Sequence, residues 1–519
     1  MTQNDAIHDL RVHASATPEK VAVVCDGEAM TYGSLEALAN RMASVFRACG
    51  LQRGDHVATL IGNRPEMLAA AWAAWRAGVY LTPMPTSLAP AELEYLVADC
   101  EASLVLVDAA YGVLAESLPQ RDAGRAGRHW LSLRGAINGY ASLEPLLARA
   151  AVLAPEQEMP GALMMYTSGT TGAPKGVFRP LLSPDWRGTP PFAADLIQLF
   201  GVGDTGVRYL STAPLYHAAP LRFALAVTAG GGTVHVMGKF DAAQALRIIA
   251  RERITHSQWV PAMFQRLLAL PADQRAEFDA PGHRCAIHGA APCSPELKRA
   301  MIEWWGPILL EYYSGSEGVG LTMIDSAEAL ARPGSVGRAR KGTVHIVDER
   351  GAELPAGETG RIYFSGTAPF EYYKAAEKTV SRTLAGGWQT FGDVGHVDVL
   401  GFLYLTDRAD DMIISGGVNI YPQEIEAVIR HVDGVWDCAV VGVPDDSFGE
   451  RPVAFVESKR TAEPHRLVLN VQKACMERLG RFKQPAQVIL IDQLPRSPTG
   501  KLLRRRLREM WQSSKVQES

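Results

Sequence analysis

The chain has 519 residues, of which 47% are hydrophobic and 21% charged. Domains usually comprise roughly 100–200 residues, so this length predicts two to four structural units rather than a single core. Lys and Arg together number 52 and Asp and Glu 56, which leaves a formal net charge of -4. This near-balance argues against nucleic-acid binding over the whole surface, although the basic run from Lys501 to Arg506 could form a local patch.

The seven cysteines are scattered along the chain, and none forms a C-x-x-C pair. This pattern argues against a disulfide framework or a zinc site and favours a reducing compartment. The segment from Met1 to Arg11 has no apolar core of the kind that a secretory signal needs. Apolar stretches such as residues 67–83, interrupted by Arg76, are too short to cross a bilayer. We therefore expect a soluble, cytoplasmic protein.

The N-terminal half alternates segments of helical periodicity with short apolar strands. Asn63 is expected to cap one helix, with Pro65 in its first turn and Gly78 after its last residue. This alternation predicts α/β layers with largely parallel strands. The expected elements are helices over residues 32–49 and 63–78 and strands over residues 56–61, 79–83 and 104–107.

The texture of the sequence changes twice in the C-terminal half. From about Thr343, short β-rich pieces at residues 344–347, 360–365 and 397–405 predict a smaller β subdomain. After Arg408, a compact unit of about 110 residues is large enough to fold by itself. We expect strands at 412–415, 436–441 and 487–491 and helices at 422–431 and 467–479 in this unit. The charged segment 406–411 predicts a hinge near Asp410 between domains 1–408 and 409–519.

The strongest motif is Tyr166-Thr-Ser-Gly-Thr-Thr-Gly-Ala-Pro-Lys-Gly-Val177, which follows an apolar strand candidate. Its glycines allow backbone N–H groups to approach phosphate oxygens, its hydroxyls add donors, and Lys175 supplies a positive charge. It is not a Walker A loop, because Gly follows the lysine where Ser or Thr is required. The alternative is a solvated turn between strands. The residues expected to bind phosphate are Thr167, Ser168, Gly169, Thr170, Thr171, Gly172 and Lys175.

This string resembles the phosphate loop of the adenylate-forming superfamily, which comprises acyl-CoA synthetases, adenylation domains and luciferase-like enzymes. The resemblance continues in order to Lys501 and is strongest to bacterial fatty-acyl-CoA-synthetase-like ligases. It implies a large N-terminal domain of α/β layers with a closing β subdomain, plus a small mobile α+β C-terminal domain. It also implies an AMP-forming acid–thiol ligase that uses ATP, Mg²⁺ and CoA.

By the same resemblance, several segments bind the nucleotide. Tyr313 would stack on the adenine, Ser316 would bind the α-phosphate, and Glu317 would ligate Mg²⁺, roles that suit a π face, a hydroxyl and a hard anionic oxygen. Ser314 and Ser316 depart from the family's Gly and Thr at these positions. The backbone of Gly289, Ala290, Ala291 and Pro292 would line the adenine, although a strand-to-helix turn capped by Ser294 is the simpler interpretation.

The ribose and the mobile domain are assigned in the same way. Asp393, at the end of a strand and after an inserted Phe391, would grip the ribose hydroxyls together with Arg408. Lys501 would act near the carboxylate and the α-phosphate in a first conformation. Gly416 and Gly417 would let the pantetheine of CoA pass close to the backbone in a second conformation.

The acid pocket is assigned by resemblance to residues whose small or apolar side chains suit a bulky hydrophobic acid of fatty, aryl-alkyl or polycyclic type. His217 would gate the pocket and the CoA tunnel, and the alternative is a hydrogen-bonded structural histidine. Arg222 could reach an extra carboxylate, although a surface arginine at a helix start is favoured. The expected wall consists of Ala218, Trp259, Met263, Gly289, Gly315 and Val319, with Ala218, Gly289 and Gly315 leaving room.

Three functions remain open at this point. The first is a complete ligase that forms an acyl-adenylate and transfers the acyl group to CoA. The second is an enzyme of the same fold that catalyses one half-reaction or loads a carrier protein, and the third is a silent nucleotide-binding protein. No nucleic-acid partner is expected, and the oligomeric state stays open, with a homodimer among the alternatives.

Overall fold

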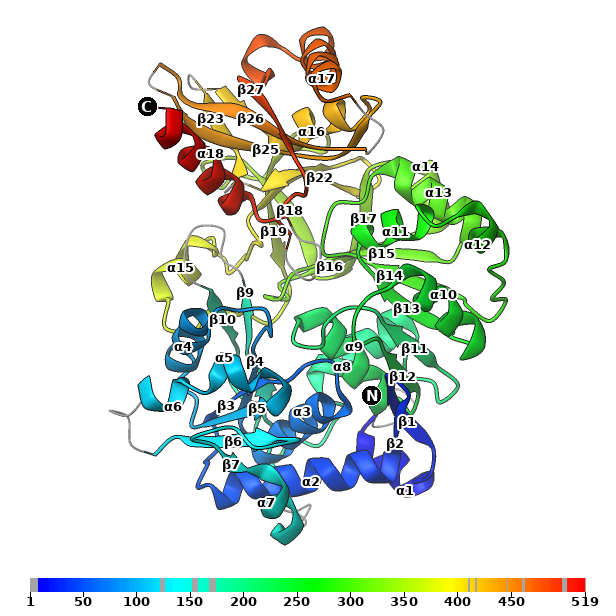
Figure 1. Ribbon diagram of the computed structural model, residues 1–519, viewed down its shortest axis with the longest axis vertical. Coiled ribbons are helices and arrows are strands. Elements are labelled where there is room, and N and C mark those ends of the chain that lie inside the picture. The colour runs from blue at the N-terminus through cyan, green and yellow to red at the C-terminus, as the bar shows by residue number, and fades with distance from the viewer. Residues whose placement is uncertain are drawn as a thin grey trace.

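The computed structural model describes residues 8–121, 127–151, 157–167, 174–408, 411–415, 418–445, 447–459, 463–496 and 502–518. Figure 1 shows a large α/β body formed by the N-terminal and central parts of the chain, with the C-terminal part above it. No helix within these described ranges has the length and apolar character needed to cross a bilayer.

A six-stranded parallel sheet forms one layer of the large body, in the order β7-β6-β5-β3-β4-β8. Its central strands are buried along their whole length, as expected for a parallel sheet covered on both faces. The strands are β3 (His56–Leu60), β4 (Tyr80–Pro83), β5 (Leu104–Asp108), β6 (His129–Leu133), β7 (Ala141–Ser142) and β8 (Ala162–Leu163). The accompanying helices are α2 (Tyr32–Ala48), α3 (Pro65–Ala77), α4 (Pro90–Asp99), α5 (Gly112–Ala115), α6 (Leu118–Arg121) and α7 (Leu143–Arg149).

A second sheet runs through thirteen strands in the order β18-β19-β21-β22-β17-β16-β15-β14-β13-β11-β12-β1-β2. It is parallel from β1 (Val21–Cys25) to β15 (Leu309–Tyr313) and antiparallel from β15 to β18. The β-rich segment that begins near Thr343 is therefore the antiparallel end of this sheet. The other strands are β2 (Glu28–Thr31), β11 (Arg208–Ser211), β12 (Thr233–Val236), β13 (His256–Trp259), β14 (Cys285–His288), β16 (Leu321–Asp325), β17 (Ser335–Lys341), β18 (Thr343–Val347), β19 (Gly360–Ser365), β21 (Asp393–Val397) and β22 (Leu403–Arg408).

Helices cover the faces of this sheet, and three further strands form a short, separate sheet. The helices are α1 (Leu10–Ala16), α8 (Pro191–Phe200), α9 (Ala218–Ala229), α10 (Ala242–Arg251), α11 (Pro261–Leu268), α12 (Ala272–Ala276), α13 (Pro295–Trp305) and α14 (Ser326–Ala331). The third sheet has the order β20-β10-β9, with β9 (Met165–Thr167), β10 (Lys175–Phe178) and β20 (Glu371–Tyr372), and α15 (Ala376–Ser381) follows it.

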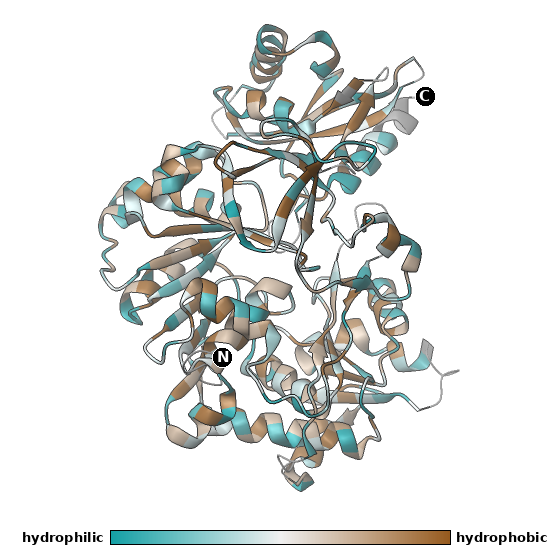
Figure 2. Cartoon of the chain, turned by 180° about the vertical axis from the view of Figure 1, so that it is seen from behind, coloured by the Kyte–Doolittle hydropathy of each residue, from teal (hydrophilic) through white to brown (hydrophobic). Residues whose placement is uncertain are grey.

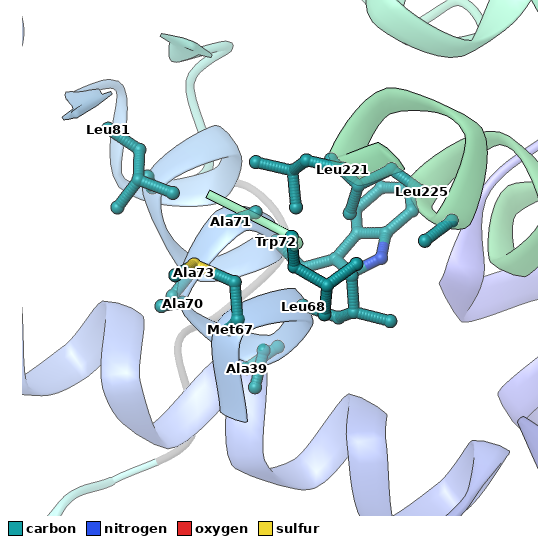
Figure 3. Packing of buried hydrophobic residues seen from close by; sticks show 14 of the residues in the cluster. Ala39, Met67, Leu68, Ala70, Ala71, Trp72, Ala73, Leu81, Leu221 and Leu225 are labelled. Carbon is teal, nitrogen blue, oxygen red and sulfur yellow. The ribbon is translucent and has the colours of Figure 1, made fainter. Parts of the chain in front are cut away.

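The largest apolar cluster lies where α3 is enclosed by α2 and α9 (Figure 3). Almost every residue of α3 is buried, and its many alanines allow the neighbouring helices to approach closely. The Trp72 ring fills the space beside Leu221 and Leu225, and its indole N–H donates to Thr228 Oγ1 at 3.3 Å. The hydrogen bond satisfies the polar atom of a ring that is otherwise buried in apolar surroundings.

The C-terminal unit is a five-stranded sheet with helices packed on it. Figure 2 shows hydrophobic colouring along its strands and alternating hydrophilic segments on its outer helices. Asp407 Oδ2, at the end of the large body, accepts a hydrogen bond of 3.0 Å from Gln423 N in this unit. The elements are β23 (Ile413–Ser415), β24 (Val418–Ile420), α16 (Pro422–Arg430), β25 (Val435–Asp445), β26 (Gly449–Ser458), α17 (Pro464–Arg478), β27 (Gln487–Ile491) and α18 (Arg504–Glu518).

Three expectations from the sequence are wrong in detail. Asn63 does not cap α3, because its amide donates to Met237 O at 2.6 Å and its carbonyl accepts from Leu215 N. Residues 397–405 are not one strand but the ends of β21 and β22, joined by a turn at Gly401 with φ of 79°. Asp393 opens β21 rather than ending a strand.

The sequence does not predict strand β26 and helix α18. The domain boundary at 408/409 remains a prediction, because Asp410 lies outside the described residues.

Candidate active site

A β-hairpin forms the base of the expected phosphate loop. Strands β9 and β10 pair with Thr167 opposite Lys175, and the Tyr95 hydroxyl donates to Pro174 O at 3.0 Å. The Tyr166 hydroxyl donates to Asp99 Oδ2 at 2.6 Å, which fixes the other strand. The hairpin therefore holds both ends of the loop, while Ser168, Gly169, Thr170, Thr171 and Gly172 lie outside the described residues.

Glu317 lies beside this hairpin, although the two are far apart in sequence. The Tyr372 hydroxyl donates to Glu317 Oε1 at 2.8 Å, and Tyr372 is the residue of β20 that pairs with Val177 of β10. Arg179, just after β10, donates to the backbone carbonyl of Glu317. Motif reasoning did not identify Tyr372 and Arg179. Of the two, only Arg179 could have been suspected from the sequence, because it is a charged residue four positions after Lys175.

The structure brings Tyr313 and Asp393 into contact. The Tyr313 hydroxyl donates to Asp393 Oδ2 at 2.6 Å, and the Phe391 ring packs edge-on to Tyr313 with 5.5 Å between centroids. Asp393 is directly opposite Arg408 in the β21–β22 register, so the backbone brings both predicted ribose-binding residues to one place. The inserted Phe391 thus packs against Tyr313, the residue expected to stack on the adenine.

The loop between β15 and β16 accommodates serine where the family has glycine. Ser314 Oγ donates to Gly320 O at 2.7 Å, which closes the loop, and Ser314 does not adopt a positive φ. No strain from the missing glycine is therefore present at this position. Ser316 is partly buried in the same loop, next to Glu317.

The segment 289–292 connects β14 to α13. Ser294 caps α13 as expected, because its Oγ accepts from Leu297 N at 3.2 Å. Ala290 is exposed and adopts a φ of 68°, a left-handed conformation that costs a non-glycine residue about 1–2 kcal/mol. Such local strain is typical of functional segments but does not by itself assign Ala291 or Pro292 to the adenine.

His217 is the residue before the first turn of α9. Its ring lies 4.7 Å from that of Tyr216, and burial lowers the pKa of the imidazole to about 4, so the ring is neutral near pH 7. Among the described residues nothing hydrogen-bonds its Nε2, which has no access to solvent. The alternative of a structural histidine held by hydrogen bonds is therefore not supported, while gating remains a prediction.

The glycines of the expected acid pocket do not leave open space. A Cβ on Gly289 would lie 2.7 Å from Tyr312 O, and one on Gly315 would lie 2.6 Å from the Phe391 ring and 2.8 Å from Glu317 Oε2. These glycines allow close packing of neighbouring chain segments. The expectation that Gly289 and Gly315 create room for the acid is wrong, which leaves Ala218 as the small residue that could do so.

The larger residues of the expected wall belong to separate packing groups. Trp259 lies edge-on to Trp305 at 5.3 Å and donates to Ser257 Oγ at 2.6 Å. Met263 packs in the same cluster, whereas Val319 belongs to a cluster at the antiparallel end of the sheet. Their place in the acid pocket stays a prediction.

Arg222 is not a surface arginine at a helix start, as was favoured from the sequence. It is partly buried on α9, its Nε has no access to solvent, and burial lowers the pKa of its guanidinium. The helix carries it inward because α9 is enclosed by other elements along almost its whole length.

Other predicted residues cannot be placed. Lys501, Gly416 and Gly417 lie outside the described residues, and for Arg408 only the backbone is described. The basic run near Lys501 is not simply a solvated patch. Arg504 is mostly buried and forms salt bridges with Glu426 at 2.6 Å and with Asp411 at 3.6 Å.

Comparison with known proteins agrees with this arrangement. Residues 10–374 match the AMP-binding enzyme family, and residues 424–501 match the AMP-binding enzyme C-terminal domain. The long-chain-fatty-acid–CoA ligase FadD13 of Mycobacterium tuberculosis is 33% identical over 97% of this chain and 98% of its own length. Indoleacetate–CoA ligase of Aromatoleum aromaticum is 32% identical over 96% of both proteins.

Solved structures show the same relationship. ATP-bound MatB from Rhodopseudomonas palustris superposes with a TM-score of 0.83 at 30% identity, covering 97% of this chain and 99% of that one. The chain therefore belongs to the AMP-binding enzymes and is an acid–CoA ligase, an enzyme class that activates carboxylic acids by adenylation.

Proposed function

We propose that the protein activates a hydrophobic carboxylic acid with ATP and transfers the acyl group to CoA. The observation that supports this proposal most directly is that three predicted nucleotide-binding features lie on connected strands. The phosphate-loop hairpin, the Glu317 carboxylate and the Tyr313–Asp393 pair are linked through β10, β20 and β15.

The first half-reaction joins two anions. A carboxylate oxygen of the acid attacks the α-phosphorus of ATP, and pyrophosphate leaves with the electrons of the broken P–O bond. Lys175 at the loop base and Ser316 beside Glu317 would stabilise the charge that develops on the phosphates, and Lys501 would approach from the C-terminal unit. Asp393 and Arg408 would hold the ribose, and Tyr313 would hold the adenine.

Magnesium fits the site as a substrate-bound ion. No group of three or more His, Cys, Asp or Glu side chains able to hold a metal occurs in the part of the chain that the structure describes. Mg²⁺ bound through one carboxylate and the phosphates of ATP needs no such group. Glu317 suits this role because Tyr372 engages its Oε1. The ion would neutralise phosphate charge, while Tyr372 holds the carboxylate in place.

The second half-reaction forms the thioester. The sulfur of CoA attacks the acyl carbon of the adenylate, and AMP leaves from that carbon. We assign the two half-reactions to two orientations of domain 409–519 relative to domain 1–408, with the pivot near Asp410. Lys501 would serve the first orientation, and Gly416 and Gly417 would serve the second.

The acid is assigned less directly than the nucleotide. The names of two related ligases indicate a long-chain fatty acid and indoleacetate, and Ala218 begins a helix in which Pro220, Leu221 and Phe223 are buried. We therefore assign a bulky hydrophobic acid.

All seven cysteines are free, which is consistent with a reducing cytoplasm.

Separate assays of the two half-reactions test this function. Pyrophosphate release and CoA-thioester formation are measured over fatty, aryl-alkyl and polycyclic acids. We expect both products with at least one acid. Pyrophosphate release without a thioester would indicate an enzyme limited to adenylation or one that loads a carrier protein. Absence of both products with every acid would contradict the proposed function.

A further inference from the structure

Asn63 connects the two large sheets at the carboxyl ends of their strands. It lies between β3 of the six-stranded sheet and α3, and it is partly buried. Its side-chain carbonyl accepts from Leu215 N at 2.7 Å, and its side-chain amide donates to Met237 O at 2.6 Å. Leu215 follows β11 and Met237 follows β12, two strands of the thirteen-stranded sheet. One side chain of the first sheet therefore holds two loops of the second.

The backbone of Asn63 makes a third connection to the same sheet. The thiol of Cys25, the last residue of β1, donates to Asn63 O at 2.8 Å. Strands β11, β12 and β1 are neighbours in the sheet, so the contacts of Asn63 span three adjacent strand ends. A short side chain that carries both a donor and an acceptor suits a position between an N–H and a carbonyl.

The bond to Leu215 holds a turn that ends at His217. His217 N donates to Pro214 O at 3.1 Å, which makes residues 214–217 a β-turn with Leu215 in its second position. The hydrogen bond of the turn does not use the N–H of this second residue. Leu215 has no exposed surface, so its N–H needs an acceptor from the protein, and Asn63 Oδ1 supplies it.

The segment between β11 and α9 is fixed on both sides of this turn. At its start, Thr212 Oγ1 donates to Gln258 O at 2.5 Å, which ties the segment to β13. At its end, Leu221 N donates to His217 O at 3.2 Å, so the turn passes directly into α9. Asn63 supports the middle of the segment, and loss of this contact would free the turn that presents His217.

We propose that Asn63 is a positioning residue for the acid site and acts through His217. The inference rests on the proposed function, in which His217 gates the acid pocket. Among the described residues nothing hydrogen-bonds Nε2 of His217, so the place of its ring depends on packing and on the backbone turn that carries it. Asn63 holds that turn from the other sheet. It should therefore affect the use of the acid and leave the binding of ATP unchanged.

Substitution of Asn63 tests this role with the full-length protein and the acid that the wild-type enzyme ligates best. Asn63→Leu removes both polar atoms at a similar side-chain size. We expect kcat/KM for the acid to fall about tenfold or more, since the buried N–H of Leu215 loses its acceptor, while the ATP KM stays within about twofold of the wild-type value. Asn63→Asp keeps this acceptor and loses the donor to Met237 O, so it should retain more activity with the acid than Asn63→Leu.

A double-mutant cycle tests whether Asn63 acts through His217. His217→Ala should lower kcat/KM for the same acid, and in this background Asn63→Leu should cause a further loss of about twofold or less. A residue with a purely structural role would lower kcat/KM by the same factor in both backgrounds. The same cycle with Asn63→Asp decides the question where Asn63→Leu does not fold.

Asn40 provides a matched control for a general loss of stability. It is a buried asparagine of α2, and its side-chain carbonyl accepts from Arg76 at 2.7 Å while its amide donates to Glu36 Oε1 at 2.9 Å. Asn40→Leu should lower the melting temperature as Asn63→Leu does, because both remove the two bonds of an amide that joins separate segments. Its KM for the acid should stay at the wild-type value.

Three outcomes would overturn the inference alone. The first is a cycle in which the effects of Asn63→Leu and His217→Ala multiply. The second is an equal rise in the KM of the acid and of ATP, or the same rise in acid KM in Asn40→Leu. The third is a His217→Ala enzyme with wild-type kcat/KM, which would leave Asn63 nothing to position. Absence of thioester with every acid in the wild-type enzyme would instead contradict the proposed function.

Discussion

Removal of the Tyr372 hydroxyl tests whether Glu317 holds the metal. Tyr372→Phe deletes one donor, at 2.8 Å from Glu317 Oε1, and leaves the ring in its contact with Phe370. A hydrogen bond to a charged group contributes about 1.5–3 kcal/mol, and loss of a residue that orients a metal ligand typically costs about 10–100-fold in metal affinity or activity. We expect the Mg²⁺ concentration for half-maximal pyrophosphate release to rise within this range.

The neighbouring residue provides a matched control. The Tyr373 hydroxyl donates to Glu101 at the same distance of 2.8 Å, on the exposed side of the chain and away from Glu317. Tyr373→Phe should leave the Mg²⁺ dependence unchanged, and thermal unfolding of both variants should stay close to that of the wild-type protein. An unchanged Mg²⁺ dependence in Tyr372→Phe, or an equal shift in both variants, would refute the assignment of Glu317.

Three further predictions concern the mobile lysine, the acid pocket and pH. Lys501→Ala should slow adenylation about 100-fold or more but spare thioester formation from supplied acyl-adenylate, and equal losses in both assays would contradict the two-orientation assignment. Ala218→Trp should lower kcat/KM for a bulky acid far more than for butyrate, with the ATP KM as control, and a uniform loss would remove Ala218 from the pocket. Stability should fall between pH 7 and pH 5, because buried histidines stay neutral in the folded protein but take up protons near pH 6.5 once unfolded. At pH 5.5 each of these histidines should lower the free energy of unfolding by about 1 kcal/mol relative to neutral pH. Denaturant midpoints that do not change with pH would contradict this. The histidines are His56, His217, His235 and His256, with pKa lowered by burial to about 4, and His283 and His288, with pKa lowered to about 3.

Local signals predicted much of the fold. The strands at 360–365 and 487–491 match the structure to the residue, and Gly78 and Ser294 end and begin helices as expected. These features depend on backbone conformation and on neighbours within a few residues. The order of the motifs likewise identified the family, because each motif carries its own chemistry.

Features that depend on distant contacts were not predictable. The pattern at Asn63 resembles a helix cap, yet its amide is used by chain segments about 150 and 174 residues away. The turn between β21 and β22 was missed because it contains Val399 and Leu400, apolar residues that are in fact exposed. The space beside Gly289 and Gly315 could not be judged from the sequence, since Tyr312 and Phe391 fill it only after folding.

The hydrogen bond between Asp407 and Gln423 has a consequence for the balance between domain orientations. Helix α16 begins with Pro422, which has no N–H, so Gln423 supplies the first backbone donor at a helix end that favours negative charge. Asp407 is buried at this end, on the other side of the expected pivot. The proposed rotation of the C-terminal unit would separate them. A bond of about 1.4 kcal/mol corresponds to a tenfold change in the populations of two states, so under the proposed rotation this aspartate would favour the orientation seen here by about that factor.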